Sequence, residues 1–373
     1  MRTINFNAHT MEVFNEMNTN YEAMSNLMTD VALKHEIYDA ETDKVISSAE
    51  ANAKILEFSR KVLGIKDIND HKAVRRAIRD NARSFYDIIE DTVEQVITVG
   101  FKEDDWFTSL VDYRNLAYGD RQDFYIEKES VLSVAKAGVS HHDHIIQRIG
   151  AGTTVSIPTS LHSIKVGADV NRYAVGQVDW VKLINAIAQA YILDTQTDIA
   201  IEVDNVAAKL PVTSTEFINT GALSASTKDA FDTIISNVSA ANDGAEVVIM
   251  GTWLALKKIN ALVNGDLFAN GQKDNNMNTG IIGVYDGVKM SVIPNRFKDR
   301  TYTAKTFSDK TILILPAVGE DGKFVKMVDV GDTMILEKAE RGDYLSDIQT
   351  HEVQREYGVG TVVGRQIGKW TLP

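Results

Sequence analysis

The chain carries at residues 123–134 the segment Asp-Phe-Tyr-Ile-Glu-Lys-Glu-Ser-Val-Leu-Ser-Val, and at residues 153–158 the segment Thr-Thr-Val-Ser-Ile-Pro. Both segments have the composition of β-strands, and the residues between them include several glycines. An isolated hairpin is at best marginally stable in water, and its free edges invite another chain. We therefore expect the residues from Asp123 to Pro158 to form a long two-stranded arm that lies on a neighbouring subunit.

A long amphipathic helix is predicted after this two-stranded arm. Asp179 is placed to cap it and Pro211 to end it, with apolar residues at helical spacing between them: Trp180, Leu183, Ile184, Ile187, Tyr191, Ile199, Val203 and Val206. At about 1.5 Å per residue such a helix spans on the order of 40 Å, more than the width of a small domain. The pattern indicates a spine that connects separate lobes.

The first hundred residues are predicted to be mostly helical. Apolar residues recur at spacings of three and four in residues 21–36, 46–63 and 71–99, and Gly100 is placed to end the third helix. No proline precedes Pro158, so helices can run without interruption. We therefore expect residues 1–109 to form a helical N-terminal arm.

The third of these helices has an unusual charge order. Its first half holds cations and its second half acids: Lys72, Arg75, Arg76, Arg79 and Arg83, then Asp87, Glu90, Asp91 and Glu94. This order opposes the helix dipole by a few tenths of a kcal/mol per exposed charge, roughly. Either the helix meets a complementary face on another subunit, which makes Arg75, Arg76 and Arg79 assembly candidates, or it presents a solvated face.

Residues 212–329 alternate between helix and strand. A helix is expected from Ser226 to Ala241 and another from Trp253 to Asn264, capped by Thr252 and ended by Gly265. Asp286-Gly287 supplies the positive φ angles of a two-residue hairpin between two strands. These signals predict a compact α/β lobe, and residues 330–373 are predicted to be closing strands.

Composition excludes several classes of function. Among 373 residues there is no cysteine, which excludes disulfides, thiolate catalysis and cysteine-based zinc sites. The formal charge of -13 argues against a broad basic surface that coats phosphate. No apolar run approaches the roughly 18 residues of a membrane span, so we expect no membrane partner.

The sharpest local cluster is His141-His-Asp-His144. On a strand, His142 and His144 would share one side, and imidazole binds zinc or nickel well. We nevertheless assign no metal or cofactor here, because an exposed or interface-packed loop tip accounts for the cluster, and protonation near pH 6.5 could tune subunit contacts. Trp106 at the start of the two-stranded arm is expected to be a hydrophobic anchor, either in the local core or against a neighbour.

Gly358-Val-Gly-Thr-Val-Val-Gly364 imitates a dinucleotide-binding fingerprint. A true fingerprint opens a helix onto a pyrophosphate within a βαβ unit, whereas this chain ends soon after Gly364. We therefore expect no nucleotide site. The paired acids of the chain are expected to lie on a charged surface, so the sequence predicts no enzyme.

The order of elements resembles the major capsid proteins of tailed bacteriophages with the Hong Kong 97-like fold. The segments Asn278-Thr-Gly-Ile-Ile-Gly-Val-Tyr-Asp-Gly-Val-Lys-Met-Ser-Val-Ile-Pro and Glu352-Val-Gln-Arg-Glu-Tyr-Gly-Val-Gly carry the resemblance, which covers about residues 107–372. It implies an α+β fold with these parts: a helical N-terminal arm (1–109), an extended loop (110–176), a peripheral spine helix (177–211), an axial α/β domain (212–329) and peripheral closing strands (330–373).

The resemblance further implies a structural function. Copies of the chain would assemble as pentamers and hexamers into an icosahedral shell around double-stranded DNA, together with portal and scaffolding proteins. The expected location is the virion capsid, assembled in the host bacterial cytoplasm. Two alternatives remain open at this point: the shell of an encapsulin-type cellular compartment, and a soluble metal-dependent enzyme that uses the histidine cluster.

Overall fold

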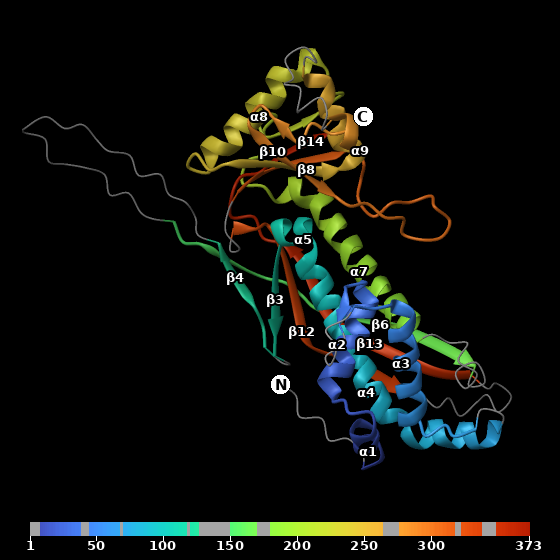
Figure 1. Ribbon diagram of the computed structural model, residues 1–373. Coiled ribbons are helices and arrows are strands. Elements are labelled where there is room, and N and C mark those ends of the chain that lie inside the picture. Colours follow the sequence, from blue (N-terminus) through green and yellow to red (C-terminus); the bar gives the residue numbers. More distant parts are fainter. Residues whose placement is uncertain are drawn as a thin grey trace, which may run out of the picture. The chain divides into compact units, whose positions relative to one another are not determined.

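The computed structural model describes residues 8–38, 45–67, 70–117, 120–126, 150–169, 180–263, 276–317, 322–337 and 348–373 (Figure 1). The chain divides into two compact units. Unit 1 comprises Met1–Asp104, Ser160–Asp194 and Val330–Tyr357, and unit 2 comprises Asp105–Thr159, Thr195–Asp329 and Gly358–Pro373. None of the helices within these described ranges is both long enough and apolar enough to cross a membrane.

Unit 1 begins with four helices: α1 (Ala8–Glu16), α2 (Tyr21–Leu33), α3 (Ser48–Val62) and α4 (His71–Glu103). Local signals set where they start. The Asn20 side chain accepts a hydrogen bond from the Ala23 amide, and Ser47 and Glu50 form a reciprocal capping box before α3. The short strands β1 (Ile37–Tyr38) and β2 (Val45–Ile46) pair antiparallel.

Helices α2, α3 and α4 confirm the prediction that the first hundred residues are mostly helical. The apolar stripe of α4 is buried, with Val74, Phe85, Ile88, Val93 and Val96 each at most 1% exposed. The expected end of α4 at Gly100 is wrong, because the helix continues to Glu103. Phe101 is still buried beyond that glycine, so packing outweighs the low helix propensity of one glycine.

A strand pair and the first part of the spine helix complete unit 1. Strand β6 (Ser160–Asp169) pairs antiparallel with β13 (Ile348–Thr361), from Ile348 opposite Asp169 to Tyr357 opposite Ser160. Helix α7 (Trp180–Asn205) begins in unit 1 and ends in unit 2, which confirms the predicted long helix; Asp179 lies outside the described residues.

Unit 2 contains a six-stranded mixed sheet in the order β7-β14-β11-β8-β10-β9. Its strands are β7 (Ile218–Thr220), β14 (Gly368–Thr371), β11 (Thr311–Pro316), β8 (Val247–Thr252), β10 (Val288–Ile293) and β9 (Val284–Tyr285). Helices α8 (Lys228–Ala241) and α9 (Trp253–Lys257) pack on it (Figure 1). Their buried core includes Phe231, Ile249 and Trp370.

Two local expectations for this lobe have different outcomes. The Asp286-Gly287 turn is confirmed, with φ angles of 42° and 89° between β9 and β10. Thr252 does cap α9 by accepting from the Ala255 amide, but the helix ends at Lys257 and continues as the 3₁₀ helix Lys258–Leu262. Helical spacing alone does not distinguish the two helix types over such a short run. Gly265 lies outside the described residues.

The remaining elements of unit 2 form the start of the predicted extended loop. Helix α5 (Asp105–Leu110) leads into β3 (Val111–Leu116), a hydrogen-bonded neighbour of β12 (Val325–Glu337). Strand β4 (Asp123–Ile126) then pairs antiparallel with β5 (Thr153–Ser156), from Asp123 opposite Ser156 to Ile126 opposite Thr153. The two flanking strands of the loop are therefore confirmed, and residues 127–149 lie outside the described part of the chain.

Candidate assembly surfaces

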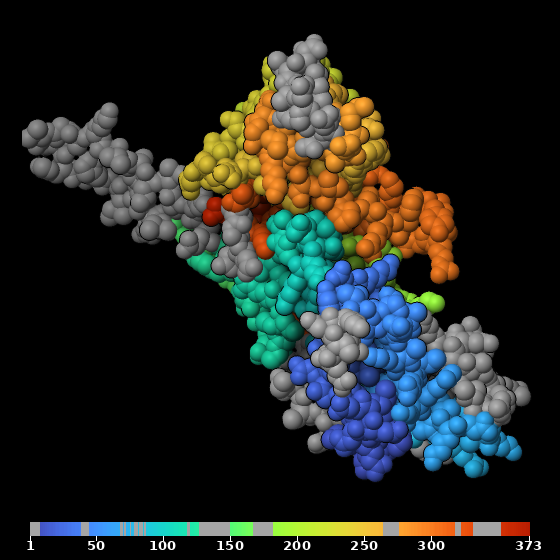
Figure 2. All heavy atoms as spheres, in the orientation of Figure 1, coloured from blue at the N-terminus to red at the C-terminus, as the bar shows by residue number. Residues whose placement is uncertain are grey.

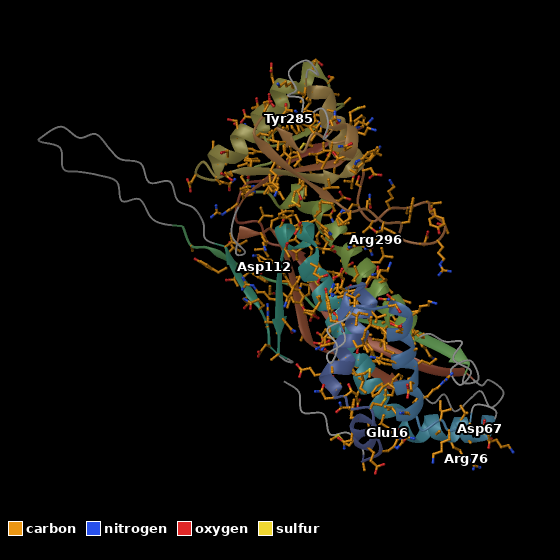
Figure 3. The ribbon with its side chains drawn as sticks, viewed as in Figure 1. Glu16, Asp67, Arg76, Asp112, Tyr285 and Arg296 are labelled. Carbon is orange, nitrogen blue, oxygen red and sulfur yellow. The ribbon has the colours of Figure 1, made fainter. Side chains whose placement is uncertain are left out.

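A buried ion pair lies under the root of the extended loop, which we define as β4, β5 and the residues that they contact in unit 2. The Lys326 Nζ lies 2.7 Å from an Asp112 Oδ2, and these side chains are 3% and 6% exposed. Arg114 also donates to that oxygen at 3.0 Å. Burial alone would raise the pKa of Asp112, but Lys326 and Arg114 hold it below its usual value, so the carboxylate stays charged. Figure 3 labels Asp112.

The ring of Phe124, in β4, packs against this ion pair. The ring is 6% exposed, and the Arg114 guanidinium and the Lys326 ammonium lie 5.0 and 5.4 Å from its centroid. Both distances suit a cation–π interaction. In the same strand pair, the Tyr125 hydroxyl accepts a hydrogen bond from the Gly152 amide at 3.1 Å. The loop root is therefore held by charged groups as well as by apolar contacts.

Two glycines of the closing segment pack against the residues that directly follow β5. A Cβ on Gly358 would lie 2.3 Å from the Pro158 carbonyl oxygen, and one on Gly360 would lie 3.1 Å from Ile157. Both glycines thus permit a close approach of two backbone segments. Packing against the residues that follow β5 therefore explains these glycines of the motif that imitates a nucleotide fingerprint.

A cavity of about 550 Å³ opens at the loop root. Arg114, Lys326 and Arg365 line it together with one carboxylate, Asp123, and the ring of Phe124. The buried Asp112 carboxylate already pairs with Lys326 and Arg114, so the described lining keeps a smaller excess of positive charge, which suits a carboxylate group from another segment. This excess of positive charge is local, since the chain as a whole carries a net charge of -13.

Trp106 lies in the local core of unit 2. Its indole is 3% exposed and meets the ring of Phe307 edge-on at 5.4 Å and that of Phe107 at 5.9 Å. Of the two interpretations left open for this residue, the structure places it in its own subunit. A contribution of Trp106 to assembly would therefore be indirect, through the segment between β10 and β11 that contains Phe307.

The other predicted assembly residues are placed only in part. Arg76 is exposed on α4 (Figure 3). Arg75 and Arg79 lie on the same helix, but their side chains are outside the described set, and so are His142 and His144 with the whole histidine cluster. The assembly role of these residues stays a prediction.

A hydrogen-bonded network in unit 1 was not predicted from the sequence. The His162 Nδ1 lies 2.7 Å from the Asp194 Oδ2, which also accepts from the Tyr357 hydroxyl at 2.7 Å. The other ring nitrogen of His162 lies 2.9 Å from the Ser160 hydroxyl, and the ring stacks on Tyr357 at 4.0 Å.

Ser160, His162 and Asp194 are hydrogen-bonded in the order of a catalytic serine-histidine-aspartate triad. However, Tyr357 shares the Asp194 carboxylate oxygen and its ring covers the imidazole. We therefore interpret the network as a lock between β6, α7 and β13. No local signal predicts it, because 32 residues separate His162 from Asp194 and 163 separate Asp194 from Tyr357.

The fold is that of phage capsid shells. The solved structure described as "Asymmetric unit of bacteriophage PhiM1 mature capsid" matches with a TM-score of 0.50 at 11% identity, covering 71% of this chain and 86% of that one. The structure of Microbacterium phage Oxtober96 matches with a TM-score of 0.47 at 10% identity, covering 70% and 90%. The match to the PhiM1 capsid structure confirms the expected Hong Kong 97-like fold class.

Sequence comparison identifies the family. Residues 23–371 match the family model described as "SPbeta prophage-derived putative capsid protein YonB", so the chain belongs to this capsid protein family. A search of curated proteins found no match. The prediction of a shell-forming structural protein is confirmed, and nothing found supports an encapsulin-type compartment or a metal-dependent enzyme.

Proposed function

We propose that copies of this chain assemble as pentamers and hexamers into the closed icosahedral head of a tailed bacteriophage. The single observation that carries the proposal is the loop root. Among the strands that the structure describes, β4 and β5 pair only with each other, and Phe124 of β4 packs on the buried pair of Lys326 and Asp112 in unit 2. A two-stranded element of this kind gains stability by lying on another chain.

The domain roles follow from this assignment. Residues 110–176 act as the extended loop over a neighbouring subunit, and residues 212–329 form the axial domain. The spine at 177–211 and the closing strands at 330–373 form the peripheral domain, while residues 1–109 add a structural arm. Many modest contacts of this kind act together, because each further contact of an already bound subunit is intramolecular.

The shell encloses double-stranded DNA without reading its sequence. The formal charge of -13 supports enclosure rather than a broad basic binding surface. Portal and scaffolding proteins are further proposed partners, with assembly in the host bacterial cytoplasm and residence in the virion.

The loop root offers a direct test of assembly. In the test chain, residues 127–152 are replaced by Asn-Gly, so that a two-residue turn joins Ile126 to its partner Thr153. We expect a folded subunit, by circular dichroism, that forms no shells in negative-stain micrographs. The matched control replaces the same residues by a glycine-serine segment of equal length.

Each outcome bears on a different part of the proposal. Shells formed by the Asn-Gly chain as readily as by the wild type would overturn the role of the loop. Shells lost in the Asn-Gly chain but kept in the glycine-serine control would show that length matters more than loop sequence. Wild-type particles expressed in the phage context that hold no nuclease-protected DNA would overturn genome enclosure.

A further inference from the structure

An exposed basic hairpin projects from unit 2 between β10 and β11. It comprises residues 295–307, and all ten residues from 296 to 305 are exposed. The hairpin stands out in orange from the ribbon of unit 2, and its atoms form a projection on the surface (Figures 1 and 2). So long an exposed run would ordinarily belong to a pliable loop.

The backbone of this hairpin is instead braced along its length. The Thr306 amide donates to the Arg296 carbonyl and the Lys298 amide donates to the Ala304 carbonyl, each at 2.9 Å. Phe297 and Lys305 form an antiparallel bridge. At the tip, the Asp299 carboxylate accepts from the Thr301 amide at 2.9 Å. The hairpin thus holds one shape before it meets any partner, which lowers the entropic cost of binding.

Its base is anchored in the core of unit 2. The Asn295 amide group donates to the Phe307 carbonyl at 2.9 Å and accepts from the Phe307 amide at 3.0 Å. Phe307 is buried against Trp106, and Asn295 also donates to Asp309 at 3.1 Å. Figure 3 marks Arg296 where the hairpin leaves this base. The base of the hairpin is therefore fixed to the buried core of unit 2.

The exposed face has the chemistry of a binding surface. Between residues 296 and 305 the chain carries four cations, Arg296, Lys298, Arg300 and Lys305, against one acid. Lys305 pairs with Asp309 at 2.6 Å, whereas the described residues record no ion pair for Lys298 or Arg300. Beside these cations, the rings of Phe297 and Tyr302 meet edge-on at 5.4 Å while 42% and 68% exposed.

We propose that this hairpin is a latch that docks on an acidic surface of a second copy of the chain. The chain belongs to a shell-forming family, so copies adjoin, and its net charge of -13 makes acidic surface plentiful on a neighbour. Tyr, Phe and Arg are enriched in protein interfaces, and Tyr and Arg are frequent among the residues that dominate their energy. A rigid basic element on an acidic chain is complementary to another copy of itself.

Nucleic acid fits the hairpin less well. The Asp299 carboxylate sits at the tip between Lys298 and Arg300, and hydrogen bonds from the Thr301 side chain and amide lower its pKa, so it remains charged. A nucleic acid carries a phosphate at every nucleotide and would repel this acid in any register, whereas a protein surface can place a donor opposite Asp299 and acids opposite its neighbours. The local cations are also few compared with the several phosphate contacts on which nonspecific DNA binding depends.

Charge reversal tests the electrostatic part of the latch. In the double variant Lys298→Glu and Arg300→Glu, like charges would meet across the interface, so we expect the concentration needed for shell assembly to rise at least about tenfold. The matched control is Lys66→Glu with Lys258→Glu, two exposed lysines elsewhere that make the same change in net charge. Assembly of the test variant at the threshold of this control would overturn the proposal.

Photocrosslinking tests the identity of the partner. With Tyr302 replaced by p-benzoylphenylalanine, assembled particles should give covalent dimers whose crosslinked peptide is rich in Asp and Glu. Mixing isotopically labelled and unlabelled chains separates links between copies from links within one chain. Links only within one chain, or only to nucleic acid, would overturn the latch. Shells missing even from the wild type would instead count against shell assembly itself.

Discussion

Asp112 and Lys326 form an ion pair 2.7 Å long, although 214 residues separate them in the chain. The pair joins β3, at the start of the extended loop, to β12 in unit 2. Both side chains are almost completely buried, and Arg114 adds a second donor to the same oxygen. A buried charge that loses its partner is costly, so this pair should make the loop root unfold together with the rest of unit 2.

The substitution Asp112→Ala should therefore destabilise unit 2 strongly. It removes the carboxylate that accepts from the buried Lys326 ammonium, and the expected loss in the free energy of unfolding is about 3–5 kcal/mol. Replacement of both partners, Asp112→Leu with Lys326→Met, should cost clearly less because no charge is left buried. Urea unfolding of the purified subunits measures both. An equal loss for the single and double variants would contradict this account.

Much of the fold follows from local signals in the sequence. The cap at Thr252 and the Asp286-Gly287 turn each act within a few residues, and the structure has both where they were predicted. The spine helix follows from a periodic stripe. The end of α4 was misplaced because a single glycine is a weak stop signal when buried residues continue beyond it.

The assembly surfaces depend more on distant partners, and that is where sequence reasoning failed. Nothing near Asp112 indicates Lys326, and nothing near His162 indicates Asp194 or Tyr357. The basic hairpin at residues 295–307 had a signal, a local excess of cations on an acidic chain. Its rigidity comes from cross-hairpin hydrogen bonds and from Trp106 beneath it, which no local pattern encodes.

A second prediction concerns the glycine run of the closing segment. The substitution Gly358→Ala would place a Cβ 2.3 Å from the Pro158 carbonyl oxygen, so two backbone segments must separate. Overpacking of this kind costs about 1–3 kcal/mol. Gly364→Ala is the control, since its Cβ would meet Ile126 at an ordinary 3.4 Å. Thermal unfolding of both chains compares them, and similar melting temperatures would show that the loop root can shift without cost.

A third prediction is a pH dependence of unit 1. His35 lies 3.2 Å from the carboxylates of both Asp30 and Glu103, and it can donate to both only as an imidazolium. Its slight burial would lower its pKa, but the hydrogen bonds to Glu103 and Asp30 raise it above 6.5. The stabilisation should therefore be complete below about pH 6.5 and disappear as the pH rises through the folded pKa.

The variant His35→Gln provides the comparison for this effect, because glutamine keeps a donor but does not titrate. The melting temperature of the wild type minus that of the variant should be larger at pH 6 than at pH 8.5. A difference that is constant over this range, or that grows with pH, would exclude the proposed role of His35.

The last prediction separates the two interpretations of the charge order on α4. Arg75 and Arg76 lie in the first turns of this helix, where acidic side chains interact favourably with the helix dipole. The double variant Arg75→Glu and Arg76→Glu should therefore leave the free energy of unfolding unchanged or slightly higher. If the cationic half of α4 meets another subunit, the same variant should still reduce the yield of shells in sedimentation at least about tenfold, because like charges then meet at the contact. A yield equal to that of the Lys66→Glu and Lys258→Glu control would mean that α4 presents a solvated face.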